Sequence, residues 1–243
     1  MMLDPHVLTT AAWLALASAQ GAAPAVVESA APSKIPPIRC KVPKAPLIRI
    51  NLTTDPINYD FSRDSRALSA IRTDSVNPYA PGTDTATGGL RYDHPETGIA
   101  VKWGSTTYAA QNAMCLWYDE VDISIRLHPT IYLAKDFDND ICRKAILEHE
   151  LKHIAVDHEV INDYGDYMGD AIRQTIDEAG AMGPYAKSPK KDIESFLMKP
   201  VMNTLHAQTA ILDERMQKRQ GAVDTLEEYQ QVSKICDDAR EQP

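Results

Sequence analysis

The chain has 243 residues, a length that allows one domain, or one domain with an appendage, and that can bury a hydrophobic core. Its formal net charge is −9 at pH 7, from 34 acidic and 25 basic residues. Nucleic acids and anionic membrane surfaces usually bind a basic face, so this balance argues against both as partners. We therefore expect one acidic domain with no nucleic-acid partner.

The N-terminal segment has features of a secretory signal. Residues 7–16 (VLTTAAWLAL) are apolar, and they are too short to span a bilayer but long enough for the core of a signal peptide. Ala17-Ser18-Ala19 follows as an AxA-type cleavage site. The first six residues contain Asp4 and no Lys or Arg, so the usual basic start is missing. The composition favours a signal peptide over residues 1–19, and the alternative is an Ala-rich leader.

The following segment has the composition of a linker. Residues 20–46 are rich in Ala, Pro and Ser. We predict that residues 47–243 form the single domain. A signal peptide implies a secreted or periplasmic protein, and no stretch of the sequence predicts a transmembrane segment.

The four cysteines are dispersed and form no CxxC pair; they are Cys40, Cys115, Cys142 and Cys236. In an exported protein this number favours two disulfides over a thiolate metal site. Of the three possible connectivities we favour Cys115–Cys142 with Cys40–Cys236. The alternative is free buried thiols in a reducing compartment.

Strand-like alternation occurs in four segments. They are residues 47–53, 99–103, 115–125 and 130–134. His128-Pro129 supplies a turn between the last two, which we expect to form an antiparallel pair leading directly into a helix. Residues 54–89 are polar, turn-rich and weakly patterned.

Helical periodicity begins at Ile141, after the N-cap side chains of residues 138–140, and can extend to about Ala181. A loop over 183–189 precedes a second amphipathic helix over 192–220, in which Pro200 must either kink the helix or start it. Thr225 to Glu228 has the form of a capping box that opens a last short helix.

The first of these helices carries His149-Glu150-Leu151-Lys152-His153, the HExxH pattern of zinc hydrolases. Helix geometry places the two histidines one turn apart, about 40° from each other, so both imidazoles can reach one metal ion. Glu150 lies beside them, where a carboxylate can act as general base on a metal-bound water. We therefore predict Zn²⁺ as cofactor.

A catalytic zinc usually takes three protein ligands, so a third is needed. His158 falls on the opposite helix face, and the glycine that would break the helix in HExxHxxGxxH is Val156 here. Asp157 shares the metal face but lies too far along the helix to ligate, so we expect it either to orient an imidazole or to be exposed. Tyr164, Tyr167 and Tyr229 are candidates for oxyanion stabilisation, although such tyrosines more often pack.

Two geometries supply different third ligands. A bend near Gly165 would return Glu178 to the histidines, as in thermolysin-like enzymes. An unbroken helix to Ala181 would leave Glu178 more than about 30 Å away and bring residues 223–229 beside the metal instead. That segment offers Asp224, Glu227 and Glu228. Glu228 is the residue that a capping box occupies, so we favour Glu227, with Glu178 as its rival.

The stretch from Cys115 to His153, a Cys-bearing strand pair followed by a Cys-containing helix with Glu148-His149-Glu150, resembles a bacterial family of predicted secreted zinc-dependent proteases. Residues 223–229 (VDTLEEY) are also similar to that group. The likeness covers about half of the chain, and the HExxH pattern is its specific part. The resemblance implies a zincin-like fold with Glu150 as base and His149 and His153 as ligands.

The predicted fold class is α+β: a small antiparallel sheet packed on the HExxH helix, followed by a long helical hairpin. The predicted function is a zinc-dependent peptidase, a hydrolase that cleaves a peptide or protein substrate, with residues 130–134 as an edge strand that binds it by β-addition. The alternative is a non-catalytic exported interaction protein with a zincin-like scaffold or a structural metal. A third interpretation treats the motif as the polar face of a surface helix.

Overall fold

The structure is a computed structural model, and it describes residues 37–71, 77–80, 82–83, 85–186 and 189–241. The predicted signal peptide (1–19) and residues 20–36 of the predicted linker lie outside these ranges. The last part of the predicted linker is attached to the domain, because Cys40 forms a disulfide with Cys115 and Lys44 Nζ lies 3.0 Å from Asp119 Oδ1.

The large sheet is built around one long strand, β5 (Ala113–Leu127). Its partners are β1 (Leu47–Thr54), which is parallel to it, and β4 (Glu96–Tyr108) and β7 (Met182–Ala186), which are antiparallel. The predicted loop over 183–189 therefore includes a strand, β7. Along β5, alternate side chains are fully buried, which is the pattern of a strand with one face on the core; they are Val121, Ile123, Ile125 and Leu127.

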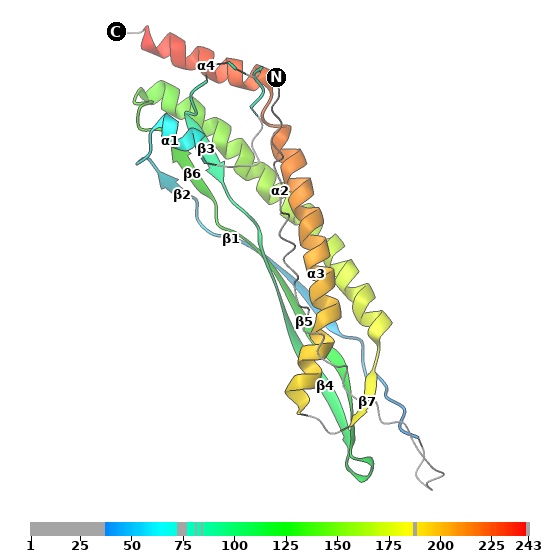
Figure 1. Ribbon diagram of the computed structural model, residues 1–243. Coiled ribbons are helices and arrows are strands. Elements are labelled where there is room, and N and C mark those ends of the chain that lie inside the picture. The colour runs from blue at the N-terminus through cyan, green and yellow to red at the C-terminus, as the bar shows by residue number, and fades with distance from the viewer. Residues whose placement is uncertain (1–36, 72–76, 81, 84, 187–188, 242–243) are drawn as a thin grey trace, which may run out of the picture.

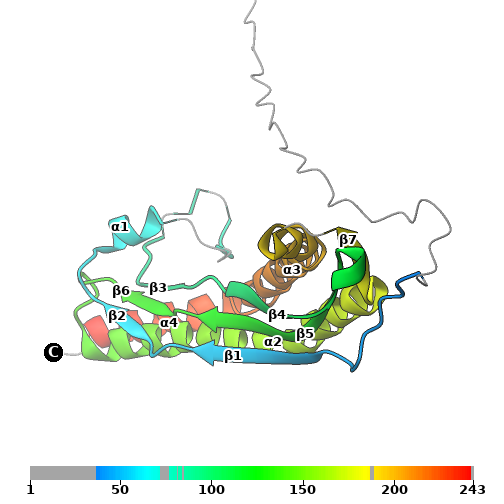
Figure 2. The same cartoon turned by 90° about the horizontal axis from the view of Figure 1, so that it is seen from below.

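A second, three-stranded sheet lies at the end of the molecule that carries the HExxH segment (Figures 1 and 2). Its order is β2 (Asn58–Asp60), β6 (Thr130–Leu133), β3 (Gly89–Tyr92). Two predictions are wrong here. β5 and β6 do not pair, because His128-Pro129 carries the chain from one sheet to the other, and β6 is the central strand rather than an edge.

Four α-helices and one 3-10 turn (Ala109–Gln111) complete the described part of the chain. The short α1 (Ser65–Ser69) precedes β3. The other three are α2 (Asp140–Ala179), α3 (Lys190–Gly221) and α4 (Leu226–Arg240). Asn139 caps α2 and Thr225 caps α4, as the sequence predicted, whereas Pro200 lies inside α3 rather than at its start.

The long helix α2 is unbroken, and α3 folds back against it as an antiparallel partner (Figure 1). Thr175 and Thr204 form a hydrogen bond near one end of the pair, at 2.8 Å, and Arg219 forms an ion pair with Glu159 near the other, at 2.6 Å. Gly169 lies in α2 where a Cβ would be 2.4 Å from Ile50 Cδ1, so the glycine lets β1 approach the helix closely.

The disulfides contradict the favoured pairing: Cys40 is bonded to Cys115 and Cys142 to Cys236. A disulfide requires Cα atoms within about 7 Å. Cys115 begins β5, and the strand then carries the chain about 40 Å before α2 starts at the other end of the molecule. Cys115 therefore cannot reach Cys142.

The α+β class and the helical hairpin of the prediction are confirmed. The sheet arrangement is not a simple antiparallel one, because β1 pairs with β5, and β2 with β6, in parallel. No helix in the described ranges is long and apolar enough to cross a membrane.

Candidate metal centre

Three side chains of the HExxH segment form a buried row along one face of α2; they are His149, Glu150 and His153. These side chains are 7, 5 and 3 % exposed, respectively. The two imidazoles are one turn apart, and their rings meet edge to face with centroids separated by 4.9 Å. This burial contradicts the interpretation of the motif as a solvated helix face.

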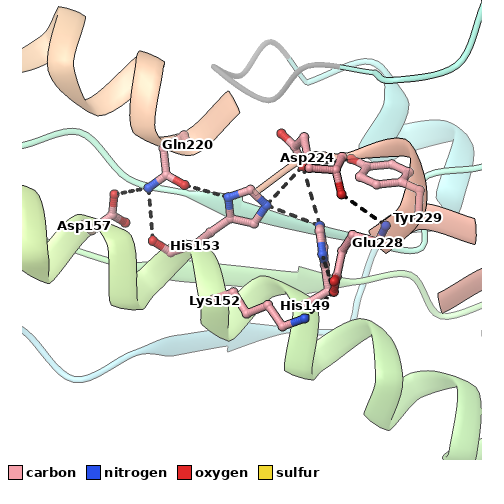
Figure 3. Close-up of polar contacts among 9 residues, drawn as sticks. His149, Lys152, His153, Asp157, Gln220, Asp224, Glu228 and Tyr229 are labelled. Atoms are coloured by element: carbon pink, nitrogen blue, oxygen red, sulfur yellow. Dashed lines mark hydrogen bonds and ion pairs between the residues drawn. The ribbon is translucent and has the colours of Figure 1, made fainter. Parts of the chain in front are cut away.

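The end of α3 and the start of α4 bring a carboxylate to this row. Asp224 is 5 % exposed, and its Oδ1 lies 3.2 Å from His153 Nε2 and 3.6 Å from His149 Nε2. The two Nε2 atoms are 3.3 Å apart. Within the described ranges these three residues form the one group of metal-binding side chains whose donor atoms converge, and Figure 3 shows Asp224 facing both rings.

Neither favoured third ligand lies in this group. Glu227 is exposed on the first turn of α4. Glu178 lies on the same unbroken helix as the histidines, about 37 Å beyond His153, where Gln174 Nε2 donates a hydrogen bond to it. The fold-back geometry was therefore predicted correctly, but the carboxylate that it brings to the histidines is Asp224.

Gln220, near the end of α3, fixes the orientation of His153. The amide Nε2 of Gln220 donates hydrogen bonds to His153 O, at 3.0 Å, and to the carboxylate of Asp157. Both are acceptors only, so the amide oxygen must face the other way, where His153 Nδ1 lies 2.6 Å from it. His153 Nδ1 therefore carries a hydrogen, and Nε2 faces Asp224 and His149 (Figure 3).

Asp157 is in turn held by Arg91 of β3. Arg91 Nε donates to Asp157 Oδ2 at 2.7 Å, and a second guanidinium nitrogen donates to Oδ1. Burial raises the pKa of Asp157 to about 6, against the opposing effect of Arg91, so the carboxylate is ionised at neutral pH. Asp157 is thus connected to His153 by the hydrogen bonds of Gln220, and it does not contact the imidazole directly.

The imidazole of His149 is also held by a contact at Nδ1, in this case from Glu228. His149 Nδ1 lies 3.4 Å from Glu228 Oε1, and Lys152 Nζ donates to the same oxygen. The hydrogen bond from Lys152 holds the pKa of Glu228 below its usual range. A carboxylate accepts only, so His149 also carries its proton on Nδ1 and directs Nε2 toward Asp224.

Glu150 lies between α2 and β3. Burial raises the pKa of its carboxyl, an effect opposed by His153 and His149 and by a hydrogen bond from the Arg91 backbone. For His153, burial lowers the pKa, but Asp224 and Glu150 outweigh it and raise the pKa overall. The neighbouring Gly89 lies so close that a Cβ there would be 2.7 Å from Glu150 Oε1.

The three candidate tyrosines lie in different places. Tyr229 is beside the centre, where its hydroxyl donates to Asp224 Oδ1 at 3.1 Å and its ring meets that of His149. Tyr164 packs in the core between α2 and α3, and Tyr167 is exposed next to it. His158 is exposed, as its helix position predicted.

A cavity of about 630 Å³ opens beside the centre. His149, Glu150 and His153 line one part of it. Its other walls come from the segment that includes α1 and β3, and from α4. The row of ionisable groups on α2 is therefore accessible to a ligand.

Sequence reasoning named Asp224 as one of three acidic residues beside the metal but favoured Glu227, and it missed Gln220 and Arg91 as residues of the site. Asp224 was within the segment expected beside the metal, and its position just before the cap Thr225 is the signal that could have selected it. The sequence around Gln220 and Arg91 carries no comparable signal.

Two imidazole nitrogens, one carboxylate oxygen and a neighbouring glutamate define the class of site: a candidate mononuclear metal centre of the HExxH type, with an aspartate completing the donor set. No family model, curated protein or solved structure matches this chain.

Proposed function

We propose that this protein is a zinc-dependent peptidase in which Glu150 is the general base and His149, His153 and Asp224 hold the metal. The observation that carries the proposal is the spacing of the three donor atoms, 3.2, 3.3 and 3.6 Å. Two ligands about 2.0–2.1 Å from a tetrahedral zinc ion lie about 3.3 Å apart.

The chemistry of the donor set fits zinc. Both histidines are held with Nε2 facing the third donor, a carboxylate oxygen, and imidazole nitrogens together with a carboxylate are common ligands of catalytic zinc. Calcium and magnesium prefer oxygen donors throughout. Although burial lowers the pKa of His153, the hydrogen bond to Asp224 raises it, and zinc would replace the proton at that contact.

Three protein donors favour catalysis over a purely structural role. Structural zinc sites are usually closed by four protein ligands, whereas catalytic sites have three and leave one position open. Within the described ranges the converging group has three members, and two of them line the cavity. The interaction-protein alternative has no comparable observation in its favour.

When bound, zinc supplies a Lewis acid that polarises a scissile carbonyl and lowers the pKa of a water. The chain supplies the proton transfers. Glu150 is positioned to accept a proton on its carboxylate from the attacking water and to pass it to the leaving amine. Gln220 and Glu228 hold the two imidazoles, and Tyr229 holds Asp224.

The edge of β3 is positioned to hold the substrate backbone. Ala134 N donates to Gly88 O, so the alternation of an antiparallel pair directs the N–H and C=O of Gly89 and Arg91 away from β6. The Arg91 N–H on this edge bonds Glu150, so the edge lies beside the proposed base, and the N–H and C=O of Gly89 are the groups that we assign to the substrate. We therefore assign β-addition to β3, in place of the 130–134 segment.

Export is part of the same proposal. All four cysteines are in disulfides, which persist in oxidising compartments such as the periplasm or the extracellular space. The peptidase would therefore act outside the cytoplasm.

The test is metal analysis together with a peptide-cleavage assay on the purified protein. We expect about one zinc per chain and cleavage that stops on chelation and returns with zinc. Glu150→Gln should keep the metal and lower kcat by about 10²–10⁴-fold. A wild type that holds no stoichiometric metal, or cleavage that survives Glu150→Gln, would refute the proposal.

A further inference from the structure

One face of α4 lies along the cavity beside the metal centre. The α4 residues that line it follow the i, i+3, i+4 spacing of a single helix face; they are Tyr229, Val232, Ser233, Cys236, Asp237 and Arg240. From Tyr229, which contacts His149, to Arg240 this face extends about 16 Å. The cavity is therefore an elongated one that begins at the candidate metal centre.

The part of the cavity next to Glu150 is apolar. Ile146, one turn before Glu150 on α2, is 5 % exposed and lines the cavity. Leu68, Phe137 and Val232 line it as well, with the Cys142–Cys236 disulfide below. Ile146, Phe137, Val232 and this disulfide belong to one hydrophobic cluster, so the pocket continues the packed core of this end of the molecule.

Gly88 closes this apolar wall. A Cβ at this position would lie 2.7 Å from Ile146 Cδ1 and 3.3 Å from Phe137 Cε1. The absence of a side chain lets the backbone before β3 contact both residues. The pocket wall is thus formed by backbone and apolar side chains directly beside the strand edge that faces Glu150.

The charged groups of the cavity lie at its two ends and are not among the side chains that form this wall. At one end are Glu150 and the histidines, and at the other end Asp237 and Arg240, which are 3.5 Å apart and neutralise each other. Among the polar side chains that also line the cavity, Ser69 and Thr87 are hydrogen-bonded to each other at 2.7 Å. A charged substrate side chain would therefore find no opposite charge at the wall.

We infer that this pocket binds an apolar side chain of the residue next to the scissile bond, and that the substrate is an extended polypeptide segment rather than a very short peptide. The inference rests on the proposed peptidase function. The face of α4 matches about five residues of extended chain at about 3.3 Å each. An apolar wall of this kind discriminates by about 10- to 200-fold per methylene that fits or fails to fit.

The test separates binding from cleavage. Fluorescein-labelled decapeptides in an Ala-rich background, with Leu, Phe, Gly, Asp or Lys at one central position, are titrated against the Glu150→Gln variant loaded with zinc. We expect the Leu and Phe peptides to bind at least tenfold more tightly than the Gly, Asp and Lys peptides. Tripeptides carrying the same Leu or Phe should bind at least tenfold more weakly than the decapeptides.

Variants of the pocket wall make the test specific. Val232→Asp should weaken Leu-peptide binding at least tenfold and strengthen Lys-peptide binding, a change of preference that misfolding cannot produce. Val232→Ala, the milder variant, should shift preference from Leu toward Phe. Ile211→Asp, at an exposed apolar position on α3, is the matched control and should leave the preference unchanged.

The outcomes distinguish the two proposals. Apolar preference in binding without hydrolysis by the wild type would refute the peptidase and leave the pocket assignment standing. Glu150-dependent hydrolysis with no apolar preference, with a preference that ignores Val232, or with equal binding of tripeptides and decapeptides would refute the pocket assignment alone.

Discussion

His153 in the interior and His128 at the surface are each held at both ring nitrogens. His153 lies between Gln220 Oε1, at 2.6 Å, and Asp224 Oδ1, at 3.2 Å, and its side chain is 3 % exposed. His128 lies between Asp55 Oδ2, at 2.7 Å, and Glu96 Oε2, at 3.1 Å, and is 44 % exposed. The contacts of the two rings are similar in length, so the two sites differ in burial and in the kind of partner rather than in distance.

The nature of the partners separates the two settings. His128 faces two carboxylates, an arrangement that favours the charged ring, and solvent screens it. His153 faces a neutral amide on Nδ1, whose orientation is fixed by Asp157 and by its own carbonyl. A buried ring supported in this way presents Nε2 in a set direction, which is what a metal ligand requires. The same residue type thus serves as a surface ion-pair partner in one place and as a candidate ligand in the other.

The largest effect is expected from removing the third donor. Asp224→Ala should abolish stoichiometric zinc binding, because two imidazoles alone leave a zinc site incomplete. Glu227→Ala, three residues away on the exposed side of α4, is the matched control and should keep about one zinc per chain. Metal content after dialysis measures both. Loss of zinc in Glu227→Ala with retention in Asp224→Ala would reverse the assignment.

The next largest effect concerns the interior ion pair behind His153. Asp157→Ala leaves the buried guanidinium of Arg91 without this carboxylate, and breaking such a pair costs about 3–5 kcal/mol of unfolding free energy. Asp55→Ala removes the corresponding carboxylate at His128, where exposure predicts little change. Urea unfolding of the metal-free proteins measures both. If the two variants lost equal unfolding free energy, burial would not explain how strongly each carboxylate stabilises the protein.

The prediction from sequence succeeded where contacts are local. His149, Glu150 and His153 are brought together by helix periodicity alone, and the run of helical residues through Gly165 to about Ala181 correctly predicted an unbroken α2. Antiparallel return of α3 then placed residues 223–229 near the histidines, which the structure also shows. These steps need only rise and rotation per residue.

The prediction from sequence failed where a residue's place in the site depends on the direction of its side chain or on strands that are distant in the sequence. Glu227 and Asp224 lie within one turn of each other, and only the cap at Thr225 decides that Glu227 points outward. Arg91 comes from β3, in a region without clear periodicity, and Gln220 is an amide in an otherwise ordinary helix end. The disulfides failed for the same reason, because the length of β5 separates cysteines that are neighbours in sequence order.

A smaller effect is expected from Gln220, which fixes the tautomer of His153. Gln220→Leu keeps the approximate volume but removes the acceptor for Nδ1–H, so zinc affinity should fall about 10- to 100-fold. Gln208→Leu, at a position on α3 that bonds Tyr164 instead, is the control and should leave the affinity unchanged. Competition with a chromophoric chelator measures the dissociation constant. Unchanged affinity in Gln220→Leu would remove this residue as a support of the ligand.

The smallest effect is expected at the exposed histidine, and it depends on pH. Hydrogen bonds to Glu96 and Asp55 raise the pKa of His128, against the opposing charge of Arg126. A raised folded-state pKa means that the stabilisation is fully present below the unfolded value, about 6.5, and is lost as the pH rises through the folded-state value. The difference in Tm between wild type and His128→Gln should therefore be larger at pH 5.5 than at pH 8.5, by no more than about 2 °C because the ring is exposed. His158→Gln, at an exposed position on α2, is the control for replacing an exposed histidine. A His128→Gln difference that stays constant with pH, or grows toward pH 8.5, would mean that the two carboxylates do not hold a charged ring.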